Sequence, residues 1–411
     1  MKILRICQET PYPPTDGVRL GPYRTSKFLA ENGHSVTLVC FQSDDRDVEP
    51  IREWCDLHTI PFSRKNTPLH LLCGALQRYP VNYVKYRDRG MLACVMRLLA
   101  SEDFDVVVVD YSALGWFALQ IRHRFPSLPI ATRWHNLDTL IWERWTESHR
   151  SPVKRLLGRI QTSFVRRLEI RLASASDVCL PVGAKDTELL RRMAPAADVR
   201  FLPAGIDLDH YSFQQAPEGK NLLFMASSYK WHANSDSLTW LHDEIMPLIW
   251  KRHPEAVLYI TGTDYTSAMV RWAADPRVVL TGFVPDERSI AAQCSLLLVP
   301  MRLGGGIKLK ILTAFAMGKA VVSTSQGAEG VAGLQDGANC LVRDDPQGFA
   351  DAVHDVLTDA SLRQSLAENA RRLVCESYGW NVVSRQFESV LQTVVARRQP
   401  AELAAAQSVA S

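Results

Sequence analysis

The feature that most constrains the fold is a regular alternation of short apolar runs with longer segments of helical period. This alternation is typical of βα units that build a parallel sheet. In the first half of the chain the runs expected to form strands are Lys2–Cys7, Ser35–Cys40, Val106–Asp110, Pro129–Arg133 and Val178–Val182. A second set then begins: Asn221–Met225, Ala256–Thr261, Val278–Thr281, Leu296–Val299 and Ala320–Ser323. The pattern therefore predicts two α/β domains of Rossmann-like type, each with a doubly wound parallel sheet.

The length of 411 residues agrees with two hydrophobic cores. We expect a first domain over residues 1–205 and a second over 206–378, which includes a helical segment at 351–376. A helix over 379–399 should return towards the first domain, and 400–411 should be a disordered tail. Because doubly wound sheets bind ligands at the carboxyl ends of their strands, two such domains facing each other form a cleft, where we expect the chemistry.

Charge and cysteine content exclude several classes of protein. The net charge of +3 is too small to indicate nucleic acid as a partner. The nine cysteines include no C-x-x-C pair, so neither a zinc site nor a disulfide framework is expected, and a reducing cytoplasm fits best. No window approaches the roughly 20 apolar residues that span a bilayer. The sequence therefore predicts a cytoplasmic protein that is soluble or peripheral to the membrane.

The most informative motif is a glycine-rich loop that follows an expected strand and opens a helix. Gly304, Gly305 and Gly306 allow backbone N–H groups to approach a ligand, and the start of the helix adds a positive end. Lys308 and Lys310 add positive charge at the same place, which suits a diphosphate leaving group. The alternative is an ordinary turn with two solvated lysines.

The motif continues as G-G-G-x-K-x-K-I-L-x-A-x-A-M-G-K, and further motifs occur earlier in the chain. M-K-I-L with P-Y-P-P-T-D-G, then W-H-N-L-D, D-V-C-L-P-V-G-A-K-D and F-L-P-A-G-I-D precede it in order. This ordered set resembles the family 4 glycosyltransferases of GT-B fold. The resemblance implies a retaining enzyme of bacterial glycan or polysaccharide biosynthesis. Such an enzyme moves a sugar from a UDP- or GDP-linked donor to a glycan, lipid-linked or small-molecule acceptor, and needs neither metal nor cofactor.

In the first domain the resemblance assigns three residues to the donor. Asp16 and Gly17 occupy the loop that faces the donor diphosphate, and His135 falls where the family places a histidine near the donor sugar. The alternatives are that Gly17 simply makes a turn and that His135 is structural.

In the second domain the family's usual Gly-Arg pair after the first strand is missing, so Lys230 is the candidate basic residue, with Ser227 and Ser228 beside it. The segment T-G-F-V-P resembles the loop that holds the nucleobase through backbone groups, which assigns Phe283 and Val284. The resemblance extends the donor site to further residues of the glycine-rich segment: Gly304, Gly305, Gly306, Ile307, Leu309 and Thr313. For catalysis it favours Lys308, Lys310 and His135.

One departure from the family is substantial. Two family glutamates, spaced eight residues apart, are replaced by Gly305 and Thr313. Some relatives with the triple glycine also lack the first, but the second would hold the ribose of the donor. An alternative reading is therefore a catalytically impaired nucleotide-sugar-binding protein, or a GT-B relative such as a sugar-nucleotide epimerase. The sequence does not specify the donor sugar, the base, the acceptor, the linkage or the oligomeric state.

The stretch 144–171 combines charge with an apolar stripe. It holds eight basic residues against Glu147 and Glu169. The apolar residues that recur at helical spacing are Val153, Leu156, Leu157, Ile160, Phe164, Leu168 and Leu172. This pattern predicts a basic amphipathic helix, which either attaches to an anionic membrane surface or packs on the core with a solvated basic face.

Overall fold

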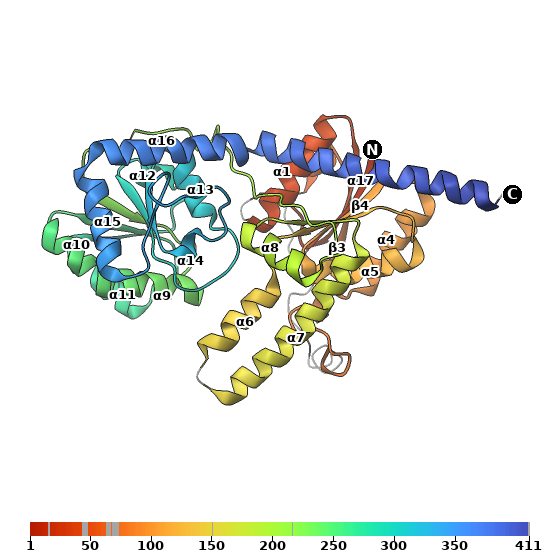
Figure 1. Ribbon diagram of the computed structural model, residues 1–411, viewed down its shortest axis with the longest axis horizontal. Coiled ribbons are helices and arrows are strands. Elements are labelled where there is room, and N and C mark those ends of the chain that lie inside the picture. Colours follow the sequence, from red (N-terminus) through yellow and green to blue (C-terminus); the bar gives the residue numbers. More distant parts are fainter. Residues whose placement is uncertain are drawn as a thin grey trace. The chain divides into compact units, whose positions relative to one another are not determined.

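The computed structural model describes residues 1–14, 17–42, 48–62, 67, 74–149, 151–215 and 217–409, with the backbone alone for 399–409. The chain forms two compact units: Met1–Pro203 together with Asn381–Ser411, and Ala204–Trp380. The second unit thus begins next to the boundary predicted at residue 206. Each unit is built on one six-stranded sheet in which every pair of neighbouring strands is parallel (Figure 1). This confirms the predicted pair of Rossmann-like, doubly wound domains.

The first unit has the strand order β3-β2-β1-β4-β5-β6. Its strands are β1 (Lys2–Cys7), β2 (Ser35–Gln42), β3 (Asp56–Pro61), β4 (Val106–Asp110), β5 (Ile130–Trp134) and β6 (Val178–Pro181). Its helices are α1 (Gly17–Glu31), α2 (Glu49–Arg52), α4 (Arg89–Ser101), α5 (Gly115–Arg124), α6 (Asp138–Ser148), α7 (Pro152–Ala175) and α8 (Ala184–Met193), with short 3-10 turns at Val84–Tyr86 and Ser112–Leu114. The winding direction reverses between β1 and β4, which makes this the switch point at which such sheets bind ligands.

Strand β3 was not predicted, and its sequence explains why. It reads D-L-H-T-I-P, and only Leu57 in it is fully buried. It pairs with β2 at the edge of the sheet, so backbone hydrogen bonds rather than an apolar run define it.

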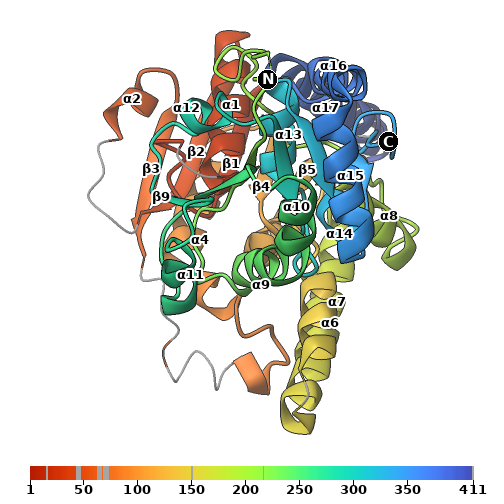
Figure 2. The same ribbon diagram turned by 90° about the vertical axis from the view of Figure 1, so that its left-hand side faces the viewer.

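The predicted amphipathic helix is α7, which carries the whole apolar stripe, but the stretch 144–171 also includes the end of α6, and the two helices pack as a hairpin (Figures 1 and 2). Pro152 stands at the first position of α7, where its missing N–H costs nothing and its ring starts a new helix. The two helices cross closely at Gly158, where an added Cβ would lie 2.2 Å from Thr146 Oγ1. In both views the hairpin projects away from the sheet of the first unit.

The second unit has the strand order β12-β11-β10-β7-β8-β9. Its strands are β7 (Asn221–Phe224), β8 (Val257–Thr261), β9 (Val278–Gly282), β10 (Leu296–Val299), β11 (Ala320–Ser323) and β12 (Leu341–Val342). Its helices are α9 (His232–Trp240), a π-helical turn at Leu241–Ile245, α10 (Met246–Arg252), α11 (Ser267–Trp272), α12 (Arg288–Ala291), α13 (Leu309–Ala316), α14 (Ser325–Ala328), α15 (Pro346–Thr358) and α16 (Ala360–Ser377). The switch point lies between β7 and β10.

Alternate residues of the second sheet bury on opposite faces. In β10, Leu296 and Leu298 belong to one core cluster, and Leu297 and Val299 belong to another. Such strands read as continuous apolar runs, which is why the sequence revealed them. The helical segment expected at 351–376 is in fact two helices, because the side chain of Asp359 accepts hydrogen bonds from the N–H groups that start α16.

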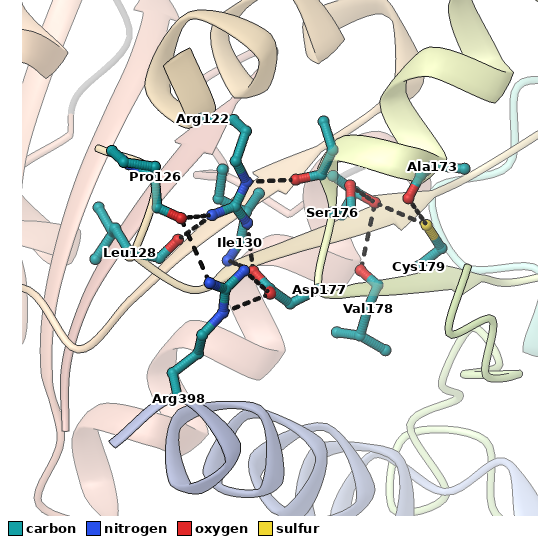
Figure 3. Close-up of polar contacts among 12 residues, drawn as sticks. Arg122, Pro126, Leu128, Ile130, Ala173, Ser176, Asp177, Val178, Cys179 and Arg398 are labelled. Atoms are coloured by element: carbon teal, nitrogen blue, oxygen red, sulfur yellow. Dashed lines mark hydrogen bonds and ion pairs between the residues drawn. The ribbon is translucent and has the colours of Figure 1, made fainter. Parts of the chain in front are cut away.

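Helix α17 (Trp380–Val409) belongs to the first unit from Asn381 onwards. Its apolar face, formed by Val383, Phe387, Leu391 and Val394, is fully buried. Near its end Arg398 donates hydrogen bonds to Asp177, which also binds Arg122 and the N–H of Ile130 (Figure 3). The helix extends past residue 400, where a disordered tail was expected. Among the described residues, none of the helices has the length and apolar character needed to cross a bilayer.

Candidate functional site

The glycine-rich loop follows β10 at the switch point of the second sheet. Gly304 and Gly306 both have positive φ, 105° and 67°, a conformation that glycine adopts without strain. The carbonyl oxygen of Gly304 accepts a hydrogen bond from Gln326 Nε2 at 2.8 Å. The carbonyls of Gly305 and Gly306 accept hydrogen bonds from Lys308 Nζ at 2.8 and 3.0 Å.

These bonds fix the orientation of three successive peptide planes. In a trans peptide the N–H points opposite to the C=O, so the N–H groups that follow these carbonyls are directed away from Lys308 and Gln326. Consecutive N–H groups presented in this way form a concave anion-binding nest. Binding of a diphosphate to these N–H groups stays a prediction.

Lys308 and Lys310 lie directly after the loop, and the ammonium group of each donates hydrogen bonds to carbonyl oxygens. Lys308 caps the start of α13 and is buried. Lys310 Nζ donates to the carbonyl of Met225, at the end of β7, and lies 5.3 Å from the ring centroid of Phe224. Burial, assisted by the charge of Lys308, lowers the pKa of Lys310 to about 7. Direct contact of either lysine with a diphosphate stays a prediction.

The loop after β7 lies at the same switch point. Lys230 is 81% exposed at its side chain, and its Nζ forms an ion pair with Asp264 at 2.7 Å. Ser228 Oγ donates to the same carboxylate at 2.7 Å, and the Ser227 carbonyl accepts a hydrogen bond from the Thr263 N–H at 3.0 Å. The hydrogen bonds that Lys230, Ser228 and the Thr263 hydroxyl donate to the Asp264 carboxylate, that of Lys230 first, lower the pKa of Asp264 to about 2. Asp264, which the sequence reasoning missed, thus neutralises the basic residue assigned to the diphosphate.

The other residues of the second unit that the resemblance assigns to the donor follow β9 or belong to the glycine-rich segment and α13. Gly282 ends β9 with φ of 70°, and Phe283 follows it as an exposed side chain. Val284, next in the chain, is half-buried. Ile307 and Leu309 pack in part against a core cluster. Thr313 lies inside α13, which begins at Leu309, and its side chain is only 5% exposed.

In the first unit Gly17 is the first residue of α1, and Asp16 lies outside the described residues. His135 follows β5 and stacks on Tyr111 with ring centroids 4.9 Å apart. Its Nε2 is buried without a hydrogen-bond partner among the residues the structure covers. Burial and the nearby Arg133 charge lower the pKa of His135 to about 3, so the ring is neutral at physiological pH.

Sequence reasoning missed the polar cluster beside this histidine. Arg5, in the middle of β1, binds Asp110 at the end of β4 through two nitrogens, and Arg133 of β5 lies next to them. The available signal was the presence of arginine inside otherwise apolar strands, since arginine is almost never buried unless it is paired.

Across the described ranges, no group of three or more His, Cys, Asp or Glu side chains has an arrangement that could hold a metal ion. The predicted independence from metal is not tested by this.

Comparison with known proteins gives two matches that together span most of the chain. Residues 15–210 match the family model of Glycosyltransferase Family 4, and residues 219–359 match that of Glycosyl transferases group 1. A relative from Klebsiella pneumoniae, an uncharacterized 44.6 kDa protein in the cps region, is 21% identical over 393 residues, which are 92% of this chain and 96% of the relative.

Many solved structures share the fold, and two of them serve as examples. Sucrose-phosphate synthase from Thermosynechococcus elongatus superposes with a TM-score of 0.73 at 16% identity, covering 97% of this chain and 100% of that one. HepE from Anabaena, in complex with UDP-glucose, superposes with a TM-score of 0.63 at 13% identity, covering 96% and 100%.

Proposed function

We propose that this chain, which belongs to the family 4 glycosyltransferases with the GT-B fold, transfers a sugar from a nucleotide-diphosphate sugar to an acceptor. The observation that carries the proposal is the glycine-rich nest at the switch point of the second sheet, whose carbonyls are held by Lys308 and Gln326. The matched HepE structure holds UDP-glucose, which supports a UDP-linked donor, and a GDP-linked donor is the other candidate.

The proposed reaction retains the configuration of the transferred sugar. In this scheme the donor phosphate assists the acceptor on the same face of the sugar ring, so the protein needs no pair of catalytic carboxylates. Its work is to position the donor and to stabilise the negative charge that develops on the diphosphate as the bond to the sugar breaks. The N–H groups of the loop and the charge of Lys308 and Lys310 perform this role without a metal ion. The acceptor is a glycan, a lipid-linked sugar or a small molecule.

The test is a screen of UDP-, GDP- and other nucleotide sugars by thermal shift, followed by turnover of each stabilising donor with and without a chelator. We expect one class of donor to raise the melting temperature and to be turned over in the presence of the chelator. A donor that binds but never reacts with any acceptor would favour the impaired, purely binding protein. Reversible loss of turnover on chelation would contradict the metal-independent scheme, and NMR of the product anomer would test retention.

We further propose that the enzyme works at an anionic membrane surface, to which the α6–α7 hairpin attaches it. Four apolar side chains at successive turns of α7 are exposed: Val153 (66%), Leu156 (59%), Leu157 (55%) and Ile160 (40%). On α6, Ile141 is 40% exposed, and Trp142 and Trp145 form an edge-to-face pair with centroids 5.5 Å apart. Tryptophan and aliphatic side chains next to basic ones are the composition of interfacial helices.

Polar side chains gather on another side of the hairpin, around a cavity of about 340 Å³ lined by Glu143, Thr146, Glu147, Arg155, Arg159 and Thr162. Arg155 and Leu156 are adjacent in sequence and therefore lie about 100° apart around the helix. The hairpin thus separates a polar face from an apolar one. Because the segment 144–171 is strongly basic, its electrostatic partner is a negatively charged lipid surface.

A further inference from the structure

We propose that Arg133 and His135 form a subsite for an anionic group, a phosphate or a carboxylate, at the carboxyl edge of β5 in the first unit. The proposal rests on the proposed function only in that the anion would belong to the sugar donor or to the acceptor. The evidence for this subsite is the number of charges and of hydrogen-bond partners in the polar cluster of Arg5, Asp110, Arg133 and His135.

The first step concerns Arg5, whose hydrogen bonds are satisfied. Its Nε and Nη2 bind the two oxygens of Asp110. Its Nη1 donates to Thr25 Oγ1 at 2.7 Å and Ser26 Oγ at 2.9 Å, both on α1. The single carboxylate of the cluster is therefore committed to Arg5, in the two-pronged geometry that is strongest for this pair.

The second step concerns Arg133, which has no bidentate carboxylate partner because both oxygens of Asp110 bind Arg5. It is 1% exposed, and within the described part of the chain its Nε and Nη1 have no hydrogen-bond partner. Its guanidinium lies against α1 at Gly21, where an added Cβ would be 3.1 Å from Nη1. Asp110 attracts Arg133 as well as Arg5, but one carboxylate faces two buried guanidinium groups, so the described part of this cluster carries one net positive charge.

The third step concerns what lies beside that charge. His135 is two residues further along the chain, and its Nε2 is also buried and unpartnered among the described residues. Since the ring is neutral, Nε2 can carry a proton and donate it to an acceptor oxygen. Tyr111, stacked on this ring, has φ of 90°, a strained value for a non-glycine residue and one that concentrates at ligand sites.

An anionic group supplies what both side chains lack, namely acceptor oxygens and a negative charge. Guanidinium is suited to it, because its planar fork matches carboxylate and phosphate oxygens. Tyr111 follows β4, next to the switch point of the first sheet, so the place agrees with the rule for ligands of doubly wound folds.

The test compares Arg133→Met with Arg5→Met in the full chain. Arg133→Met removes the second of two buried positive charges that share one carboxylate, so we expect the melting temperature to stay level or rise. Arg5→Met leaves the buried Asp110 carboxylate without its bidentate partner and should lower the melting temperature strongly. Affinities for inorganic phosphate, glucuronate and UDP are then measured by calorimetry, with chloride at matched ionic strength as the control for screening.

Support is a dissociation constant for at least one probe that is tenfold or more weaker in Arg133→Met, with the melting temperature preserved. If UDP is the affected probe, the anion is the donor diphosphate. If glucuronate is affected and UDP is not, the anion belongs to an acidic sugar. A change of less than about twofold for all three probes, or a collapse of stability like that of Arg5→Met, would overturn the subsite. Phosphate and glucuronate report on it even if the chain transfers no sugar.

Discussion

Lys308 and Lys310 stand two residues apart, yet they act on the glycine-rich loop in different ways. Lys308 binds two carbonyls of the loop itself and so fixes the direction in which the N–H groups point. Lys310 binds the end of β7 and holds a poorly solvated amine beneath the loop. Lys308 orients the peptide groups of the loop, whereas Lys310 places an amine close to it. The two roles lead to separate predictions.

Lys308→Ala and Lys310→Ala are each expected to slow turnover far more than they destabilise the fold. Loss of a preorganised group at a developing charge costs on the order of 2–4 kcal/mol in the transition state. Lys220, which precedes β7 at the opposite edge of the sheet and pairs with Glu255, provides the control as Lys220→Ala. Steady-state kinetics with the accepted donor measure the effect, and near-normal turnover in both loop variants would refute the site.

The pKa of Lys310, about 7, predicts that binding of a nucleoside diphosphate depends on pH. An anion near this amine raises its pKa, so binding takes up a proton at any pH between the free and the bound value. Affinity for UDP or GDP should therefore fall as pH rises from 7 to 9. Calorimetry in buffers of different ionisation enthalpy measures the uptake directly. In Lys310→Met both the uptake and the slope should disappear, and their persistence would assign the proton elsewhere.

Thr313→Glu restores the glutamate that the family places on the ribose. Because Thr313 is 5% exposed within α13, the new carboxylate should lower the melting temperature of the free protein by an amount that reflects several kcal/mol. If it reaches the ribose hydroxyls, UDP or GDP should recover part of this loss, since charge-assisted hydrogen bonds contribute roughly 1.5–3 kcal/mol. The ligand-induced shift would then exceed that of wild type. A lower melting temperature with no larger shift would remove Thr313 from the donor site, and Thr313→Val controls for the lost hydroxyl.

At this scale the sequence located the loop but not its hydrogen bonds. The partner of Lys310 is 85 residues away, and that of Lys230 lies on another strand-end loop, so neither acceptor is visible in a local motif. The Arg5–Asp110 pair spans 105 residues in the same way. The position of a motif can be predicted from the spacing of residues along the chain. The partner of a charged side chain depends on which strand ends lie next to each other in the sheet.

At the scale of elements, the α6–α7 hairpin shows what a periodicity analysis can and cannot predict. The stripe Val153, Leu156, Leu157 and Ile160 was found at the correct spacing, yet the structure leaves it exposed instead of packing it on the core. The same stripe continues to Leu168 and Leu172, which are buried. The helical periodicity of the apolar residues does not distinguish the exposed first half of α7 from its buried second half. Burial depends instead on the point at which the helix leaves the sheet.

The double variant Leu156→Asp with Leu157→Asp should abolish binding to vesicles that contain anionic phospholipid. Both side chains are more than half exposed, so the change should leave the free energy of unfolding within about 1 kcal/mol of wild type. Val270, 55% exposed on α11, gives the matched control as Val270→Asp. Cosedimentation measures binding, and full binding by the double variant would exclude this face from the membrane contact.

At the scale of the whole molecule, the chain builds the first unit from both of its ends. The two crossings between the units are adjacent: the N–H of Ile206 donates to the Tyr378 carbonyl at 2.7 Å, and the N–H of Trp380 donates to Ile206 at 3.2 Å. The restart of the strand pattern suggested a first crossing near residue 206, and the helix expected over 379–399 suggested a second. An amphipathic helix does not by itself specify the surface on which it packs, so the periodic pattern alone could not assign α17 to one unit.

Removing residues 381–411 should therefore unfold the first unit, although its sheet is complete without them. The truncation removes five buried side chains and exposes the apolar surface that they cover: Val383, Phe387, Val390, Leu391 and Val394. At about 1.5–3 kcal/mol for each, the loss is comparable with the entire stability of a domain. It also removes the ion pairs of Arg397 with Asp198 and of Arg398 with Asp177.

The matched control ends the chain after Arg398, which keeps every one of these contacts. We expect the longer truncation to lose the cooperative transition of the first unit in calorimetry, and the shorter one to melt like the full chain. The UDP-induced shift of the second unit should survive in both if Ala204–Trp380 holds the nucleotide by itself. A cooperative first unit in the longer truncation would mean that α17 covers a core that is already stable.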